Sequence, residues 1–169
     1  MAKGHIITDT YGWQAWRGGT HRGIDFGWPG GSAGQPVYAV QAGSVVAQPY
    51  DPGGFGWYLD IDSSDAEGSN LWVYGHIVPH VRVGDHVEAG QLIAYVNADR
   101  ATNGGVDPHV HVEVHKYTRQ PSGPGRMDPF PFLVDALYPG ERLPDPTPAP
   151  IPGSDAWNVI AEQFMGRNK

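Results

Sequence analysis

The sequence has no cysteine, few charged residues and no long apolar run. Without cysteine there is no disulfide framework, and any metal site must be built from histidine, aspartate or glutamate. No apolar stretch approaches the length of a membrane span, and Met1 to Tyr11 lacks the basic segment and apolar run of a secretory signal. Charged residues make up only 17% of the chain, and the net charge is −7. This acidic balance lacks the basic footprint expected for nucleic-acid binding.

What the sequence does contain is typical of a globular β domain. The chain has 169 residues and is 40% apolar, which suffices for one hydrophobic core. Its 24 glycines, 16 prolines and many aromatic residues favour short strands joined by tight turns. No segment before residue 130 has a convincing helical period, so we expect a mostly β, antiparallel architecture.

Short segments rich in valine, isoleucine, tyrosine and tryptophan are predicted to be strands. They are Ile24–Phe26, Pro36–Val40, Ser44–Gln48, Trp57–Ile61, Leu71–Tyr74, Leu92–Val96 and His109–Val114. Residues 1–20 read as irregular, and Pro129–Leu137 as a short helix or turn at the end of the sheet.

The chain is predicted to divide into three parts. Residues 1–138 form the folded domain, and the Pro-rich tract 139–153 forms an extended, semi-rigid linker. Residues 154–169 then form a short amphipathic helix. This helix would be either the start of a further module or a docking peptide, because it is too short to fold alone.

The histidines carry the chemical signal. His21 and Asp25 form an H-x-x-x-D pattern, and His109 and His111 form an H-x-H pattern within a predicted strand. Strand residues two apart point the same way, so His109 and His111 converge on one site, and His76 ends another predicted strand. Two imidazoles and one carboxylate with an open position are typical of catalytic zinc, which needs a base and an oxyanion donor nearby. Each pattern alone is weak, but their joint occurrence in one β domain points to such a site.

Five segments also resemble a known family, in order and in spacing. They are His21-Arg22-Gly23-Ile24-Asp25-Phe26, the Gly34–Val46 stretch, Tyr74-Gly75-His76-Ile77, the Val83–Ala94 hairpin and Pro108-His109-Val110-His111-Val112-Glu113. From about Gly4 to Phe132 the chain is similar to the lysostaphin-like zinc endopeptidases of peptidoglycan. The resemblance implies their antiparallel β-sheet core, of the barrel-sandwich hybrid type with long loops.

The resemblance also implies residue roles. His21, Asp25 and His111 would bind one zinc ion per chain, His109 would be the general base, and His76 would stabilise the intermediate. The expected activity is hydrolysis of peptide bonds in the stem peptide or cross-bridge of bacterial peptidoglycan, causing cell-wall lysis by a monomeric catalytic domain.

The expected place of action is the cell wall, outside the cytoplasm. Because no signal peptide is visible and the Pro-rich linker resembles those of phage endolysins, we expect a phage-encoded enzyme released from the host cytoplasm or carried on a virion. The loop 97–107 replaces the short Gly/Ser/Thr run of the family, and we expect it to shape the substrate groove.

Other readings compete with these. A non-catalytic peptidoglycan-binding or regulatory module on the same fold is the alternative function, although such relatives lose ligands that this chain keeps. A biotinyl-type or lipoyl-type carrier is excluded because the only lysines, Lys3, Lys116 and Lys169, lie outside the Val83–Ala94 hairpin.

Several residues near these motifs have open assignments. Glu113 could accept a hydrogen bond from a ligand histidine or be merely structural, while His115 is expected not to bind the metal. His5, His80 and His86 are expected at the surface, and Asp60 and Asp62 in solvent. The remaining assignments concern aromatic residues that could line a groove or pack in the core: Tyr11, Trp13, Trp16, Trp28, Phe55 and Trp57.

Overall fold

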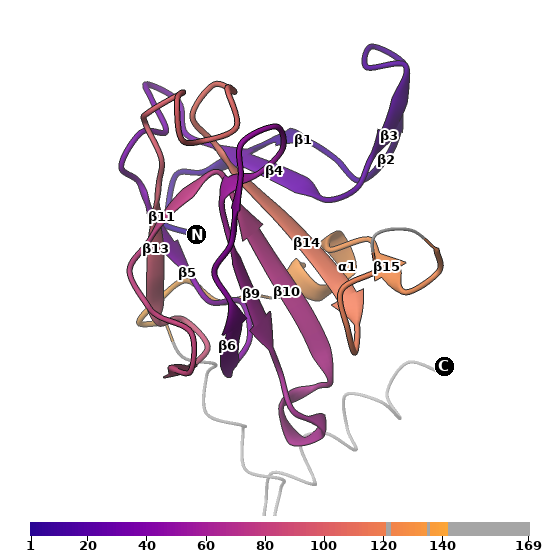
Figure 1. Cartoon of the computed structure of the whole chain (residues 1–169), viewed down its shortest axis with the longest axis vertical. Coiled ribbons are helices and arrows are strands. Elements are labelled where there is room, and N and C mark those ends of the chain that lie inside the picture. The colour runs from indigo at the N-terminus through magenta and orange to yellow at the C-terminus, as the bar shows by residue number, and fades with distance from the viewer. Residues whose placement is uncertain (121–122, 135, 142–169) are drawn as a thin grey trace, which may run out of the picture.

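The computed structural model describes residues 1–120, 123–134 and 136–141, and almost all of its regular structure is β-strand (Figure 1). Every strand pair in the described residues is antiparallel, which confirms the predicted fold class. Helical structure in this part of the chain is limited to the 3-10 turn η1 (Asp65–Glu67) and helix α1 (Phe130–Leu133). Within the described ranges, no helix is long and apolar enough to cross a membrane.

The main sheet has eight strands and runs in the order β1-β4-β14-β10-β9-β6-β12, with β15 paired to the far part of β14. Its strands are β1 (Ile6–Asp9), β4 (Ile24–Gly27), β6 (Gly43–Ala47), β9 (Leu59–Asp62), β10 (Asn70–Gly75), β12 (His86–Val87), β14 (Val110–Lys116) and β15 (Arg126–Met127). The strand order places β4 and β14 side by side, although they are far apart in the sequence.

A second, three-stranded sheet in the order β11-β13-β5 packs beside the main sheet (Figure 1). Its strands are β5 (Pro36–Tyr38), β11 (Ile77–Pro79) and β13 (Leu92–Val96). Two ribbons complete the fold: β2 (Gly12–Gln14) with β3 (Gly19–His21), and β7 (Tyr50–Asp51) with β8 (Gly56–Trp57). The β2–β3 ribbon projects from the body of the molecule (Figure 1).

The hydrophobic core lies on one face of the main sheet. Strand β14 sends Val110, Val112 and Val114 into it, all fully buried, and β10 adds Trp72 and Tyr74. Burying a side chain of this size stabilises the fold by roughly 1.5–3 kcal/mol. Because strand side chains alternate, the residues between these valines emerge on the opposite face.

That opposite face carries the polar groups. On β14 these are His111, Glu113 and His115, all buried, and β4 and β9 add Asp25 and Asp60. Such groups tolerate burial only when they are paired or bind a metal. The alternation of valine and polar residues along β14 therefore separates a core face from a site face.

The structure confirms the predicted strands and corrects two other expectations. All seven predicted segments contain strands, although the fourth, Trp57–Ile61, is divided between β8 and β9. The interpretation of residues 1–20 as irregular is wrong, since β1, β2 and most of β3 lie there. Asp60 is only 6% exposed, because its strand lies inside the main sheet, so its predicted solvent exposure is wrong. The predicted linker beyond residue 141 and the predicted helix 154–169 lie outside the described residues.

Candidate metal centre and imidazole pair

Three predicted ligands meet where β3, β4 and β14 come together. Asp25 and His111 are directly opposite each other in the β4–β14 pairing, so the sheet register alone places their side chains side by side. His21 is the last residue of β3, and Arg22 and Gly23 turn the chain back into β4. All three residues are buried.

The donor atoms of these residues form a compact triangle. Asp25 Oδ1 lies 2.7 Å from His111 Nδ1 and 3.2 Å from His21 Nε2, and the two nitrogens are 3.1 Å apart. Zinc–ligand bonds of about 2.0–2.1 Å in a tetrahedron put neighbouring donors roughly 3.3 Å apart. The triangle is slightly tighter than that, so the residues fit a zinc ion with little adjustment.

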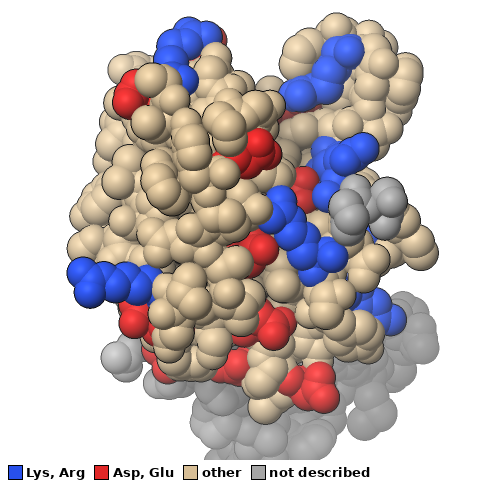
Figure 2. Space-filling model, viewed as in Figure 1, with Lys and Arg blue, Asp and Glu red and all other residues tan. Residues whose placement is uncertain are grey.

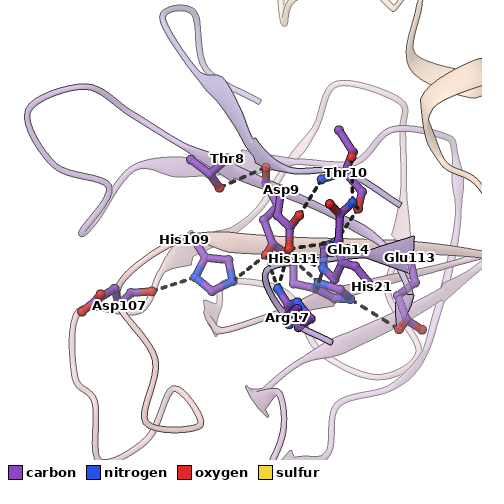
Figure 3. Close-up of polar contacts among 11 residues, drawn as sticks. Thr8, Asp9, Thr10, Gln14, Arg17, His21, Asp107, His109, His111 and Glu113 are labelled. Atoms are coloured by element: carbon purple, nitrogen blue, oxygen red, sulfur yellow. Dashed lines mark hydrogen bonds and ion pairs between the residues drawn. The ribbon is translucent and has the colours of Figure 1, made fainter. Parts of the chain in front are cut away.

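The other nitrogen of each imidazole is held by an acceptor. His21 Nδ1 donates to the carbonyl of Thr10 at 3.0 Å, and His111 Nε2 lies 3.3 Å from Glu113 Oε1 (Figure 3). A donated N–H fixes the tautomer and leaves the opposite nitrogen with its lone pair directed at the site. Of the two open readings of Glu113, the structure supports the acceptor for a ligand histidine.

Charges around the triangle favour a cation. Burial alone would raise the pKa of Asp25, but hydrogen bonds with His111 and His21 outweigh it and hold that pKa far below its usual value. Burial likewise opposes the charged form of Glu113, yet His111 and His115 lower its pKa to about 2. Burial would lower the pKa of His111, and the two carboxylates raise it instead. An environment that favours a proton on His111 also favours a metal ion there.

Gly23 is required by the close approach of β14. A Cβ at this position would lie 2.7 Å from the imidazole of His111 and closer still to the carbonyl of Val112. Since the Val112 carbonyl belongs to the sheet, it cannot move aside cheaply. Any side chain at position 23 would therefore displace a candidate ligand.

His76 and His109 form a second unit beside the triangle. Their ring centroids are 4.5 Å apart, and His109 Nε2 lies 3.6 Å from Asp25 Oδ2. His76 Nδ1 donates to the carbonyl of Asn103 at 2.8 Å, and His109 Nδ1 donates to that of Asp107 at 2.7 Å (Figure 3 shows the latter). A carbonyl only accepts, so both neutral rings carry their lone pair on Nε2.

His76 has two unusual properties. Its φ is 61°, in the left-handed region that few residues other than glycine adopt, and its backbone N–H donates to the carbonyl of Phe55. Burial and the nearby charge of His109 lower its pKa to about 4. In the substrate-free chain, His76 is therefore a neutral imidazole across the physiological pH range.

Sequence reasoning missed what the loop 97–107 does. Besides any groove that the loop shapes, its carbonyls of Asn103 and Asp107 orient the imidazoles of His76 and His109. Asn103 is fully buried, and its side chain donates to the carbonyls of Asn97 and Val106 and accepts from the N–H groups of Gly105 and Val106. The sequence contains the Asn103-Gly104-Gly105 turn. This turn predicts a tight backbone turn, but it does not predict that the Asn103 carbonyl binds His76.

His115 was predicted not to bind the metal, and it stands apart from the ligand group. It is fully buried and binds Glu113 Oε2 at 2.8 Å. Arg126 Nη2 approaches the same oxygen at 3.4 Å. Glu113 thus links His111 to a second polar cluster that sequence reasoning did not foresee.

A cleft of about 360 Å³ opens over these groups. All five predicted site histidines and carboxylates line it, together with Arg22, Phe55 and Glu113. Of the aromatic residues with open assignments, Phe55 lies in the cleft, Trp28 is in the core, and Trp13 and Trp16 are 68% and 73% exposed on the β2–β3 ribbon. The expected surface position holds for His80 and His86, whereas His5 is partly buried against Phe26.

Comparison with the sequences of known proteins gives two informative relatives. Lysostaphin from Staphylococcus simulans is 32% identical over 137 residues, which are 80% of this chain and 26% of lysostaphin. The glycyl-glycine endopeptidase ALE-1 from Staphylococcus capitis is 33% identical over 122 residues, 72% of this chain and 31% of ALE-1. The chain thus spans about a quarter to a third of the length of these relatives.

Solved structures agree with the sequence matches. The catalytic domain of lysostaphin from S. simulans superposes with a TM-score of 0.63 at 29% identity, covering 77% of this chain and 92% of that domain. A zinc-containing peptidase from Vibrio cholerae superposes with a TM-score of 0.58 at 28% identity, covering 75% of this chain and 36% of that one. The model of peptidase family M23 matches residues 19–124, a range that contains the triangle and the imidazole pair. The chain belongs to peptidase family M23.

Proposed function

We propose that this chain is a zinc-dependent endopeptidase that hydrolyses peptide bonds in the stem peptide or cross-bridge of bacterial peptidoglycan. The observation that carries the proposal is the donor triangle of His21, Asp25 and His111, with two oriented imidazoles at its open side. Family membership, the zinc-containing relative and the wall-acting relatives support the cofactor and the substrate.

His21, Asp25 and His111 would hold the zinc. When bound, it supplies a Lewis acid for the scissile carbonyl and lowers the pKa of water at the site toward about 7. The carboxylate of Asp25 keeps the site anionic enough to retain the ion, while Glu113 and the Thr10 carbonyl keep both ligand imidazoles in the binding tautomer.

His109 is the general base in this proposal. Its Nε2 lone pair faces the site because Nδ1 is committed to the Asp107 carbonyl. When Nε2 takes up a proton, the imidazolium lies 3.6 Å from Asp25 Oδ2, and the carboxylate stabilises it. The same proton can then be given to the leaving amine.

His76 assists from the other side of the cleft. With Nδ1 donating to Asn103, its Nε2 is an acceptor while the ring is neutral. It therefore stabilises the developing oxyanion only after receiving a proton. Because the two rings are 4.5 Å apart, a positive charge on His109 lowers the pKa of His76 and disfavours two imidazolium rings at once.

The non-catalytic alternative is not supported by the site. A binding module has no need for two imidazoles with lone pairs directed at a metal triangle. We assign the activity to the domain of residues 1–138, acting as a monomer on the wall outside the cytoplasm. The phage origin stays a prediction.

The direct test is digestion of purified cell walls. Walls of several peptidoglycan types are incubated with the protein, with the His111→Ala variant, and with the protein plus a zinc chelator restored by added zinc. Mass spectrometry should show fragments with new amino termini only in the active, zinc-replete samples. Intact walls in every sample, with zinc bound, would contradict the proposal.

A further inference from the structure

Three arginines gather beside the candidate metal centre of this acidic chain. Arg22 lines the cleft together with His111 and Glu113. Burial lowers the pKa of Arg126, and the charges of Arg22 and Arg119 lower it further. Arg126 Nη2 lies 3.4 Å from Glu113 Oε2, and Arg119 stacks on Phe55. Because Glu113 and Phe55 line the same cleft as Arg22, all three guanidinium groups adjoin this cleft. Figure 2 shows basic side chains gathered on the face below the projecting β2–β3 ribbon.

The arginine cluster (Arg22, Arg119, Arg126) lies within reach of a peptide bound at the metal centre. The Arg119 Cζ is 5.3 Å from the ring centroid of Phe55, which is itself 5.3 Å from that of His111. Three residues of extended peptide span ~10 Å, which is close to the sum of these distances. A substrate group at the cluster would be within about three residues of the scissile bond.

Aromatic rings hold Arg119 in place. Its Cζ also lies 4.5 Å from the ring centroid of Tyr58, so the guanidinium covers two aromatic faces at once. Its side chain is still 28% exposed. Stacking through the guanidinium face leaves the N–H groups at its edge available, and these match a carboxylate in a bidentate arrangement.

Nearby acids compensate Arg119 and Arg126 only in part. The Arg119–Asp60 approach is 3.6 Å, longer than a hydrogen bond, and burial raises the pKa of Asp60. Glu113 divides its two oxygens among His111, His115 and Arg126. Within the described residues, Arg126 Nε is buried without a hydrogen-bond partner. Buried polar groups normally find partners, so the compensation of Arg126 is incomplete. The partly exposed Arg119 is the member of the cluster that can accept a further anion.

We propose that the arginine cluster is a subsite for a free carboxylate of the substrate peptide, within about three residues of the bond that is cut. This inference rests on the proposed function and narrows its substrate. Stem peptides of peptidoglycan carry free carboxylates, whereas a glycyl-glycine bond in a cross-bridge is flanked by none. The cluster therefore selects an anionic stem peptide over a neutral oligoglycine bridge.

The test uses matched synthetic peptides that span the bond identified in the wall digest. Each peptide is made in two forms, with a carboxylate or a carboxamide at every acidic position within three residues of that bond. The wild type should cleave the best carboxylate form with a kcat/KM at least about tenfold above its amide, as expected for a charge-assisted contact. Arg119→Gln should reduce that ratio toward one, while zinc content stays the same.

Two further variants keep the test decisive. Arg119→Lys keeps the charge but loses the planar fork, and it should give an intermediate ratio even if Arg119→Gln fails to fold. Arg82→Gln, a change at an exposed arginine in the turn before β12, should leave the ratio unaltered. Equal cleavage of acid and amide forms by the wild type overturns the subsite. Absence of cleavage of any peptide or wall instead overturns the proposed function.

Discussion

The two groups of side chains in the cleft are held in different ways. Asp25 and His111 sit opposite each other in the main sheet, and His21 ends the adjacent ribbon. His76 and His109 take their orientation from the carbonyls of Asn103 and Asp107 in a loop. Sheet register fixes the donor triangle, whereas loop conformation sets the direction of the imidazole pair. Changes in the triangle should therefore reduce zinc binding, whereas changes in the imidazole pair should reduce turnover while zinc stays bound.

The largest effect should come from the triangle itself. Asp25→Asn removes the charge and leaves only a weak amide-oxygen donor while preserving size, so both zinc content and wall hydrolysis should fall sharply. Asp62→Asn, at a carboxylate on β9 outside the triangle, is the matched control and should behave as the wild type. Elemental analysis and a wall-turbidity assay measure both properties. An Asp25→Asn protein with full zinc content would show that the triangle is not what holds the metal.

His109→Ala should separate the two groups most clearly. A positioned acid–base group contributes about 10²–10⁴-fold to rate. We therefore expect turnover to fall by that factor at full zinc occupancy, with a melting temperature near that of the wild type. His80→Ala, which removes an exposed imidazole outside the cleft, should leave turnover unchanged. If His109→Ala loses zinc as His111→Ala does, the ligand set must be redrawn.

Glu113→Gln tests the support behind the triangle. Replacing the carboxylate weakens its hold on His111 Nε2 and removes a charge that favours the cation. Changes of this kind typically cost 10–100-fold in metal affinity. Competition with a zinc chelator measures the shift, and Glu88→Gln, at an exposed carboxylate, is the control. An unchanged zinc affinity would show that Glu113 is purely structural.

Asn103→Ala tests the loop. The amide loses two donated and two accepted hydrogen bonds, which should destabilise the domain by about 2 kcal/mol and lower its melting temperature by about 5 °C. The Asn103 carbonyl would no longer hold His76 reliably, so kcat should fall several-fold with zinc retained. A zinc loss as large as the loss of turnover would mean that the loop and the triangle are one unit.

The smallest effect at neutral pH should be that of His76, whose contribution to stability changes only on acidification. Its pKa is about 4 in the folded chain and ~6.5 when unfolded, so only the unfolded state takes up this proton as the pH falls through that window. His76 therefore reduces stability on acidification from pH ~6.5 to 4 and contributes no pH dependence above it. His76→Asn, which tolerates a positive φ, lacks this proton uptake. The melting temperature of the wild type relative to His76→Asn should decline across the window at constant excess zinc; a constant difference would contradict the assignment.

Much of the fold could be predicted because β14 alternates valine with polar residues, and the same alternation predicted that His109 and His111 converge. The first 20 residues could not, since β2 and β3 are only three residues long and pair locally as a ribbon, while β1 is short and pairs with the distant β4. The donor triangle was accessible because its members carry distinctive side chains. The orientation of His76 and His109 was not accessible. Every residue has a backbone carbonyl, so the sequence does not show which carbonyl accepts a hydrogen bond from each imidazole.

The arginine cluster was out of reach for a related reason. Arg119 and Arg126 follow β14 in a turn and a short strand, while Arg22 precedes β4, and no spacing rule connects them. Their proximity arises from the pairing of β15 with β14 and from the aromatic rings under Arg119. Such long-range charge groupings depend on three-dimensional packing alone.

Because Asp25 and His111 are opposite each other on neighbouring strands, metal binding depends on the correct pairing of β4 with β14. If β14 slipped by one residue against β4, Val110 or Val112 would face Asp25, and the polar residues of β14 would turn into the core. A slipped chain would have no donor triangle, so the free energy of ion binding would stabilise the correct register alone. During folding, ion binding would therefore favour chains with the correct β4–β14 register over chains with a slipped one, before any substrate binds.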